Sequence, residues 1–312
     1  MQVQQAQIVK LLQDLAPNEG YNLTPLPGVR LLRSNRPLSR TPVLYDPGIV
    51  IVCQGCKRGY FGGRCYIYDA QQYLAVSVPV PFSMETEASA EQPLLAIYIH
   101  LDFKLAAELM LQLQQHGFTT LSSVPESMMS SPVGNELKAS VLRFLQVLSK
   151  SPDAEVLGPS LLRELYFHFL TGEQGNVLRS ALNMQGRFGS ISTVLKYIHS
   201  NYSDALNLNL ANLASKADMS VPTFHSHFKS ITGLSPIQYI KSVRLHQARM
   251  LMVRQSVKAL EACHAVGYES PSQFNREFKR LFGKPPAEEA KRMRKEFNIP
   301  PAHEPANYIS SH

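Results

Sequence analysis

The first hundred residues alternate short apolar runs with turn-forming residues. Between Leu26 and Leu101, runs such as GIVIVCQG and PLLAIYIHLD are rich in β-branched, aromatic and aliphatic side chains. Gly, Pro and Asp separate these runs, which is typical of the connections between strands. Several strands at this spacing predict a small barrel or a two-sheet sandwich in the N-terminal part of the chain.

After Asp102 the apolar residues recur every three or four positions, which is the period of an amphipathic helix. Three helices with short connections are predicted, and they would pack on one another or on a second copy of the chain. The positions that define them are Leu105, Leu109 and Leu113; Leu137, Val141, Phe144, Leu145 and Leu148; and Leu157, Leu161, Leu165 and Phe169.

A break in this helical pattern suggests where one domain ends. A short helix is expected within 171–184, and a linker containing Gly and Ser is expected near 183–190. We therefore divide the chain into an N-terminal domain at 1–184, a second domain at 185–297 and a flexible tail at 298–312.

The second domain contains one pattern twice, SVPTFHSHFKSITGLSP from Ser220 and SPSQFNREFKRLFGKPP from Ser270. Each copy predicts a helix with a Ser N-cap, a Pro in its first turn and a Gly at its end. Gln273 would complete a capping box with Ser270. Two Phe residues four positions apart would turn inward in each helix. The shared positions are Ser220/Ser270, Phe224/Phe274, Phe228/Phe278, Lys229/Lys279, Gly233/Gly283 and Pro236/Pro286.

Each copy follows a short helical stretch and a turn of small residues, LANLASKADMS before the first and VKALEACHAVGYES before the second. The second turn has one extra residue, Glu269. A helix, a tight turn and a second helix form a helix-turn-helix unit, whose second helix can enter a major groove of DNA. The two units are predicted at about 208–230 and 257–280.

A continuous helix is predicted between the two units. Ser235 and Gln238 have the spacing of a capping box, and neither Gly nor Pro interrupts Ile237 to Val253. About 18 residues at ~1.5 Å each span ~27 Å, which is close to the ~34 Å between successive major-groove faces on one side of DNA. One chain could therefore place two recognition helices a turn apart on a long, non-palindromic site.

Charge is distributed unevenly along the chain. Residues 186–297 hold 17 Lys and Arg against 8 Asp and Glu, whereas the other residues hold 14 against 16. This excess in the second domain predicts a polyanionic partner, most simply double-stranded DNA. The alternative from charge alone is a basic domain that is merely soluble.

The start of the chain lacks the cationic residues and long apolar run of a signal peptide. No window approaches 18 apolar residues, so no membrane span is expected. Without a secretory signal, the four cysteines predict free thiols in a reducing cytoplasm. They are Cys53, Cys56, Cys65 and Cys263.

Three interpretations remain open for Cys53 and Cys56: buried inert thiols, a redox or electrophile sensor together with Cys65, or a metal site. Zinc would need two more ligands, and only Cys65 and His100 are near in sequence. A cupin enzyme would need a His-x-His cluster and a carboxylate for iron or manganese. His100 is the single histidine of residues 26–101, so we expect no catalytic residue, metal or cofactor.

The stretches LASKADMSVPTFHSHFKSITGLSPIQYIKSVRLHQARMLM and AVGYESPSQFNREFKRLFGKPPAEE resemble the AraC/XylS transcriptional regulators over about 191–292. The runs PGIVIVCQGCKRGYFGG, YIYDAQQYLAVSVPVP and EQPLLAIYIHLD resemble the sensing domain of the AraC subgroup that contains YqhC-like regulators. The resemblance implies an α+β chain with a cupin-like β-barrel, flanking helices and an all-α DNA-binding domain. It implies a cytoplasmic activator, rather than a repressor, that responds to a small-molecule effector, contacts RNA polymerase and can form a homodimer.

The resemblance also implies that exposed residues early in each recognition helix contact bases. By chemistry, Arg276 suits the O6 and N7 atoms of guanine, and Asn275 suits adenine. Lys229, Lys279 and Arg280 suit phosphates. The expected base contacts are Val221, Pro222, His225 and Ser226 in the first unit, and Pro271, Ser272, Asn275 and Arg276 in the second.

An effector pocket in the barrel would be lined by Arg64, Tyr66, Tyr68 and Tyr73. The alternative for these tyrosines is core packing, because aromatic residues that alternate along strands commonly face the interior. Three other functions are weighed against an effector-controlled regulator: a regulator switched through the cysteines, a cupin enzyme fused to a DNA-binding domain, and an architectural protein that binds DNA without a preferred sequence.

Overall fold

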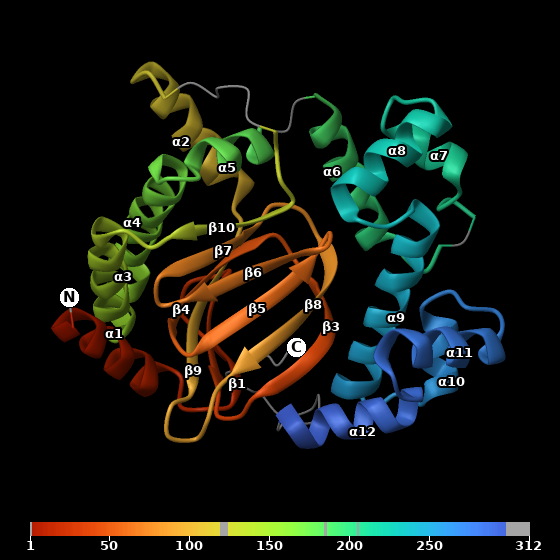
Figure 1. Ribbon diagram of the computed structural model, residues 1–312, viewed down its shortest axis with the longest axis horizontal. Helices are drawn as coiled ribbons and strands as arrows, with labels where there is room; N and C mark the ends of the chain where they lie inside the picture. Colours follow the sequence, from red (N-terminus) through yellow and green to blue (C-terminus); the bar gives the residue numbers. More distant parts are fainter. Residues whose placement is uncertain (1, 119–123, 184–185, 205, 298–312) are drawn as a thin grey trace. The chain divides into compact units, whose positions relative to one another are not determined.

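The structure is a computed structural model that describes residues 2–118, 124–183, 186–204 and 206–297 of the 312-residue chain (Figure 1). The tail expected at 298–312 lies outside the described residues. The chain divides into two compact units, which we describe separately. The first compact unit comprises 1–40, 46–78 and 84–183, and the second comprises 41–45, 79–83 and 184–312.

One curled, ten-stranded sheet dominates the N-terminal part of the chain (Figure 1). Its strands follow the order β1-β2-β9-β4-β7-β6-β5-β8-β3, and β10 pairs with β7 beside this path. This arrangement confirms the predicted barrel-like fold. The strands are β1 (Gly20–Leu23), β2 (Val29–Ser34), β3 (Leu38–Tyr45), β4 (Gly48–Gln54), β5 (Cys56–Phe61), β6 (Arg64–Asp69), β7 (Gln72–Val76), β8 (Val80–Glu87), β9 (Leu94–His100) and β10 (Met128–Pro132).

The central strands explain the two continuous apolar runs of the sequence. β9 lies between β2 and β4 and is antiparallel to both. Every residue of β4 except Gln54 is buried, and every residue of β9 except His100 is buried. A strand that is covered on both faces needs apolar side chains on both, so its sequence does not alternate.

Among the described residues of the first compact unit, five helices accompany the sheet. Their apolar faces share one core with the sheet, in which Leu12, Ile97, Phe144 and Phe169 are each at most 2% exposed. The three helices predicted from the apolar spacing and the short helix within 171–184 are confirmed. The helices are α1 (Gln2–Leu15), α2 (Phe103–Gln115), α3 (Asn135–Leu148), α4 (Ser151–Thr171) and α5 (Gly175–Leu182).

The second compact unit is mainly helical over its described residues from 186 to 297. In Figure 1, α9 runs between one pair of helices, α7 and α8, and another, α10 and α11. Because α6 begins at Gly186, part of the linker expected near 183–190 is helical. The helices are α6 (Gly186–Ser200), α7 (Leu210–Lys216), α8 (Val221–Thr232), α9 (Pro236–Arg254), α10 (Ala259–Ala265), α11 (Pro271–Phe282) and α12 (Pro286–Phe297).

The ends of α8 and α11 follow from their sequences. Ser220 and Ser270 are the N-caps, and each side chain accepts a hydrogen bond from the backbone three residues later. Gly233 and Gly283 end the helices in the left-handed conformation, with φ of +74° and +80°. The repeated motif therefore builds two helices of equal length.

Candidate nucleic-acid interface

The first recognition helix, α8, exposes the residues expected to contact bases. Phe224 and Phe228 are completely buried, and the Phe228 ring meets the Tyr239 ring of α9 at 5.3 Å between centroids. This packing turns the opposite face of α8 outward. The exposed residues on that face include Val221, Pro222, His225, Ser226 and Lys229.

The second recognition helix, α11, repeats this arrangement. Phe274 and Phe278 are at most 1% exposed, and they join Leu245 and Met252 of α9 in one apolar cluster. The outer face of α11 therefore carries polar and basic side chains. Its exposed residues include Pro271, Ser272, Asn275, Arg276, Lys279 and Arg280.

Among the described residues, the basic residues on these outer faces are unpaired, unlike several other basic residues of the same unit. Within the described part of the chain, the side chains of Lys229, Arg276, Lys279 and Arg280 form no ion pair or hydrogen bond. By contrast, Lys241, Arg249, Lys284 and Arg292 each lie within 4.0 Å of a carboxylate. The outward cations can therefore contact phosphates without breaking an ion pair.

Arg244 of α9 joins the connection between α6 and α7 to the turn of the second helix-turn-helix unit, a role that the sequence did not reveal. Its Nε donates to the carbonyl oxygen of Tyr202 at 2.7 Å, and its Nη1 donates to that of Gly267 at 3.3 Å. Tyr202 lies between α6 and α7, whereas Gly267 lies in the turn of the second helix-turn-helix unit. The sequence did contain a clue to this role. An arginine among the apolar residues of the linker helix needs nearby hydrogen-bond acceptors.

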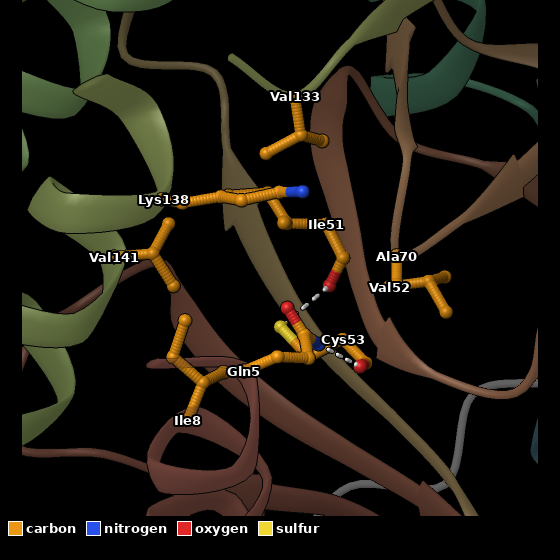
Figure 2. Close-up of a pocket in the computed structure, with 9 residues that line it drawn as sticks. All are labelled: Gln5, Ile8, Ile51, Val52, Cys53, Ala70, Val133, Lys138 and Val141. Carbon is orange, nitrogen blue, oxygen red and sulfur yellow. Dashed lines mark hydrogen bonds between the residues drawn. The ribbon is translucent and has the colours of Figure 1, made fainter. Parts of the chain in front are cut away.

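The first compact unit contains a small pocket between α1, α3 and β4 (Figure 2). Its cavity volume is about 10 Å³, which is room for about one water molecule. Figure 2 shows the Lys138 side chain reaching from α3 toward the strand that carries Ile51 and Cys53. The other lining residues are uncharged.

The four residues expected to bind an effector do not line this pocket. Arg64 is exposed and faces Glu126 at 3.4 Å. Tyr68 and Tyr73 are buried, and the Tyr73 ring lies 5.2 Å from that of Phe169, in the core of the first compact unit. Tyr66 is half-buried. Their contact with an effector stays a prediction.

The cysteines give little support to a thiol-based switch. Burial raises the pKa of the Cys53 thiol to about 12, against a smaller lowering by the Lys138 ammonium. Burial also raises the pKa of Cys56. Because the thiolate is the reactive form, these shifts lower the reactivity of both thiols. Cys65 is exposed, and all four cysteines are free.

The described residues offer neither a metal centre nor a membrane-spanning helix. No group of three or more His, Cys, Asp or Glu side chains among them could hold a metal ion. None of the helices in the same residue ranges is long and apolar enough to cross a membrane.

Comparison with known proteins adds family information to this geometry. Residues 25–177 match the family described as AraC-type transcriptional regulator N-terminus, and residues 213–292 match a helix-turn-helix domain family. The chain is 22% identical to the virulence regulon transcriptional activator VirF of Yersinia enterocolitica over 74% of its length and 77% of VirF. It is 26% identical to the transcriptional activator RhaS of Pectobacterium carotovorum, over 48% of its length and 52% of RhaS.

The fold also matches a solved structure. Wild-type ToxT from Vibrio cholerae, bound to an unsaturated fatty acid, aligns with a TM-score of 0.56 at 14% identity. The alignment covers 88% of this chain and 96% of ToxT. At this low identity the comparison supports a shared fold, with a barrel-like domain and helix-turn-helix units, and nothing further.

Proposed function

This chain belongs to the AraC/XylS family of transcriptional regulators, and on that premise we propose that it is a sequence-specific DNA-binding activator whose two recognition helices enter successive major grooves. The observation that carries the proposal is the repeated outer face of α8 and α11, exposed in the same pattern on either side of α9. Two short helices on one rigid connector read a longer site than one helix can.

The exposed side chains divide into readers and positioning contacts. Arg276 can donate two hydrogen bonds to guanine, and Asn275 can pair with adenine. In the first helix-turn-helix unit His225 is the strongest candidate reader, and Val221 offers an apolar contact to a thymine methyl group. The proposed phosphate contacts are Lys229, Lys279 and Arg280, which carry no sequence information but hold the protein in register.

The N-terminal unit is the proposed effector-binding part of the chain. Its match to the AraC-type N-terminal family supports this role, and the structure of ToxT with a fatty acid offers a precedent in that protein. The candidate contacts are Arg64, Tyr66, Tyr68 and Tyr73. As an activator it would work in the cytoplasm with RNA polymerase, and its N-terminal helices could also join two copies.

A footprint of the full chain on DNA fragments selected by binding tests the proposal. We expect one asymmetric site with two protected major-groove patches about 10 base pairs apart. Uniform protection without a preferred sequence would instead support an architectural protein. Adding metabolites to the same assay, small acids included, should reveal one that changes the affinity.

A further inference from the structure

The two recognition helices share one burial pattern except at a single position. From the first helical residue to the C-terminal Gly, each residue of α8 falls in the same class, buried, half-buried or exposed, as its counterpart in α11. The exception is seven residues after the N-cap. There α8 has a half-buried His227, whereas α11 has a buried glutamate, Glu277, which is 8% exposed.

Glu277 receives hydrogen bonds from three different elements. Lys241 Nζ of α9 donates to Oε1 at 2.7 Å, and the Tyr268 hydroxyl, in the turn before α11, donates to Oε2 at 2.8 Å. Gln273 Nε2, one turn earlier on α11, donates to Oε1 at 3.1 Å. The Gln273 side chain therefore bonds to Glu277 and does not form the capping box with Ser270 that the sequence predicted.

These donors keep the buried carboxylate charged. Burial opposes ionisation, but the hydrogen bonds from Lys241, Tyr268 and Gln273 hold the pKa of Glu277 below its usual value. The carboxylate, in turn, ties the recognition helix to the linker helix and to its own turn. A charge-assisted contact of this kind has a more defined geometry than apolar packing alone.

The first helix-turn-helix unit has a different construction at the same place. Met219 stands where the second has Tyr268, and Thr223 stands where it has Gln273. The His227 side chain makes no hydrogen bond within the described residues, and its carbonyl accepts one from Ser230 Oγ at 2.9 Å. α8 contacts α9 through the Phe228–Tyr239 ring pair, which is an apolar contact without a charged partner.

Glu277 cannot itself be a base reader. It is buried on the side of α11 that faces α9, and both of its oxygens already accept hydrogen bonds. Lys241 is likewise engaged and is not a free phosphate ligand. The remaining role for this pair is to set the orientation of the helix that carries Asn275 and Arg276.

We infer that Glu277 is a positioning residue that fixes the second recognition helix on the linker helix, and thereby fixes the spacing in base pairs between the two half-sites that the protein accepts. The first recognition helix, without such an anchor, adapts more readily. This inference rests on the proposed DNA-binding function, since spacing has meaning only if both helices read one duplex.

The test uses the full chain, a selected operator and two derivatives with the half-site spacing changed by one base pair. For the wild type, each change should lower affinity at least about tenfold, because one base pair rotates a half-site by roughly 35°. In Glu277→Gln this penalty should fall to about threefold or less, since the isosteric amide has no negative charge and keeps only a weaker, neutral hydrogen bond from Lys241. Affinity for the correct spacing should fall, while protection of the first half-site remains.

Two further variants separate positioning from folding. Lys241→Met removes the partner from the linker helix, so it should weaken the spacing penalty as Glu277→Gln does. His227→Gln changes the matching position of the first helix-turn-helix unit and should keep the wild-type penalty. The inference is overturned if Glu277→Gln retains the wild-type penalty, or if both half-sites lose protection together with a lower melting temperature. A wild type without any preferred site would refute the proposed function instead.

Discussion

At the scale of single residues, Arg276 and Lys279 lie on the same exposed face of α11 but should affect binding differently. Arg276→Ala should cost ~1–3 kcal/mol of binding free energy and relax the preference at one base pair, since it removes the proposed base contact. Lys279→Ala should weaken binding to all sequences alike, because phosphates carry no sequence information. Binding of each variant to a library of single-base operator changes measures both effects.

The control for this pair is random duplex. Lys279→Ala should lose affinity for random and specific DNA by the same factor, and Arg276→Ala should lose much more on the specific site. If Arg276→Ala binds both duplexes as the wild type does, Arg276 is not the reader, and Asn275 becomes the next candidate on α11.

The sequence predicted these outward residues but not the network behind them. Inward Phe pairs, Ser caps and terminal Gly residues fix which side of each helix is exposed, and these are local signals. Glu277 differs from His227 at the same offset, and that substitution was visible in the repeat. Its partners were not, because Lys241 and Tyr268 are brought to it by the packing of α11 on α9.

At the scale of elements, the turn of the second helix-turn-helix unit depends on Gly267. Its φ is +81°, and a Cβ there would lie 2.4 Å from the carbonyl oxygen of Ser203. Gly283 has a similar φ of +80°, but nothing lies within 4 Å of its Cβ position. At both sites the positive φ disfavours any residue with a Cβ. Of the two, only Gly267 would also clash with the backbone of another segment.

Comparison of the two alanine variants isolates that clash. Gly283→Ala should cost about 1–2 kcal/mol, the usual penalty for a left-handed alanine. Gly267→Ala should cost at least about 2 kcal/mol more, because the Ser203 backbone must move and the Arg244 contacts with it. Amide hydrogen exchange of α10 and α11 in the full chain measures both opening free energies. Equal losses would show that the contact with Ser203 is easily relieved.

Helices and strands were predicted correctly where a local sequence pattern was strong. They were missed where contacts with distant segments determine the structure. The linker helix was expected from Ile237 to Val253 and spans Pro236–Arg254, because its capping box and unbroken helical residues are local signals. β10, with the sequence MMSSP, has no strand pattern and exists through its pairing with β7. At the start of α6, Gly186 and Gly189 read as a linker, yet Phe188 and Ile191 are buried and hold the helix.

At the scale of the whole molecule, the basic charge and the match to a sensing-domain family fall on different parts of the chain. The positive excess lies in residues 186–297, on the part with two reading helices, while the N-terminal unit has the AraC-type match. The strand-rich first part, the repeated helical units and this division of charge could be predicted from periodicity, repeat and composition, whereas the cupin-like barrel was implied by the family resemblance. The pocket beside Lys138 could not be predicted, since its lining residues come largely from α1, α3 and β4, which are distant in sequence.

The charge division makes the salt dependence of DNA binding the most direct measurement on the intact protein. Lysines and arginines that contact phosphates release counterions, so about 6 such contacts should give a slope near −5 in a plot of log affinity against log salt concentration. Lys229, Lys279 and Arg280 supply three of these cations in our assignment, and each alanine variant should make the slope shallower by about 1. Lys284→Ala is the matched control, because this lysine is paired with Glu288 at 3.0 Å and should leave the slope unchanged. A wild-type slope near zero would contradict phosphate binding by these faces, whatever bases the protein prefers.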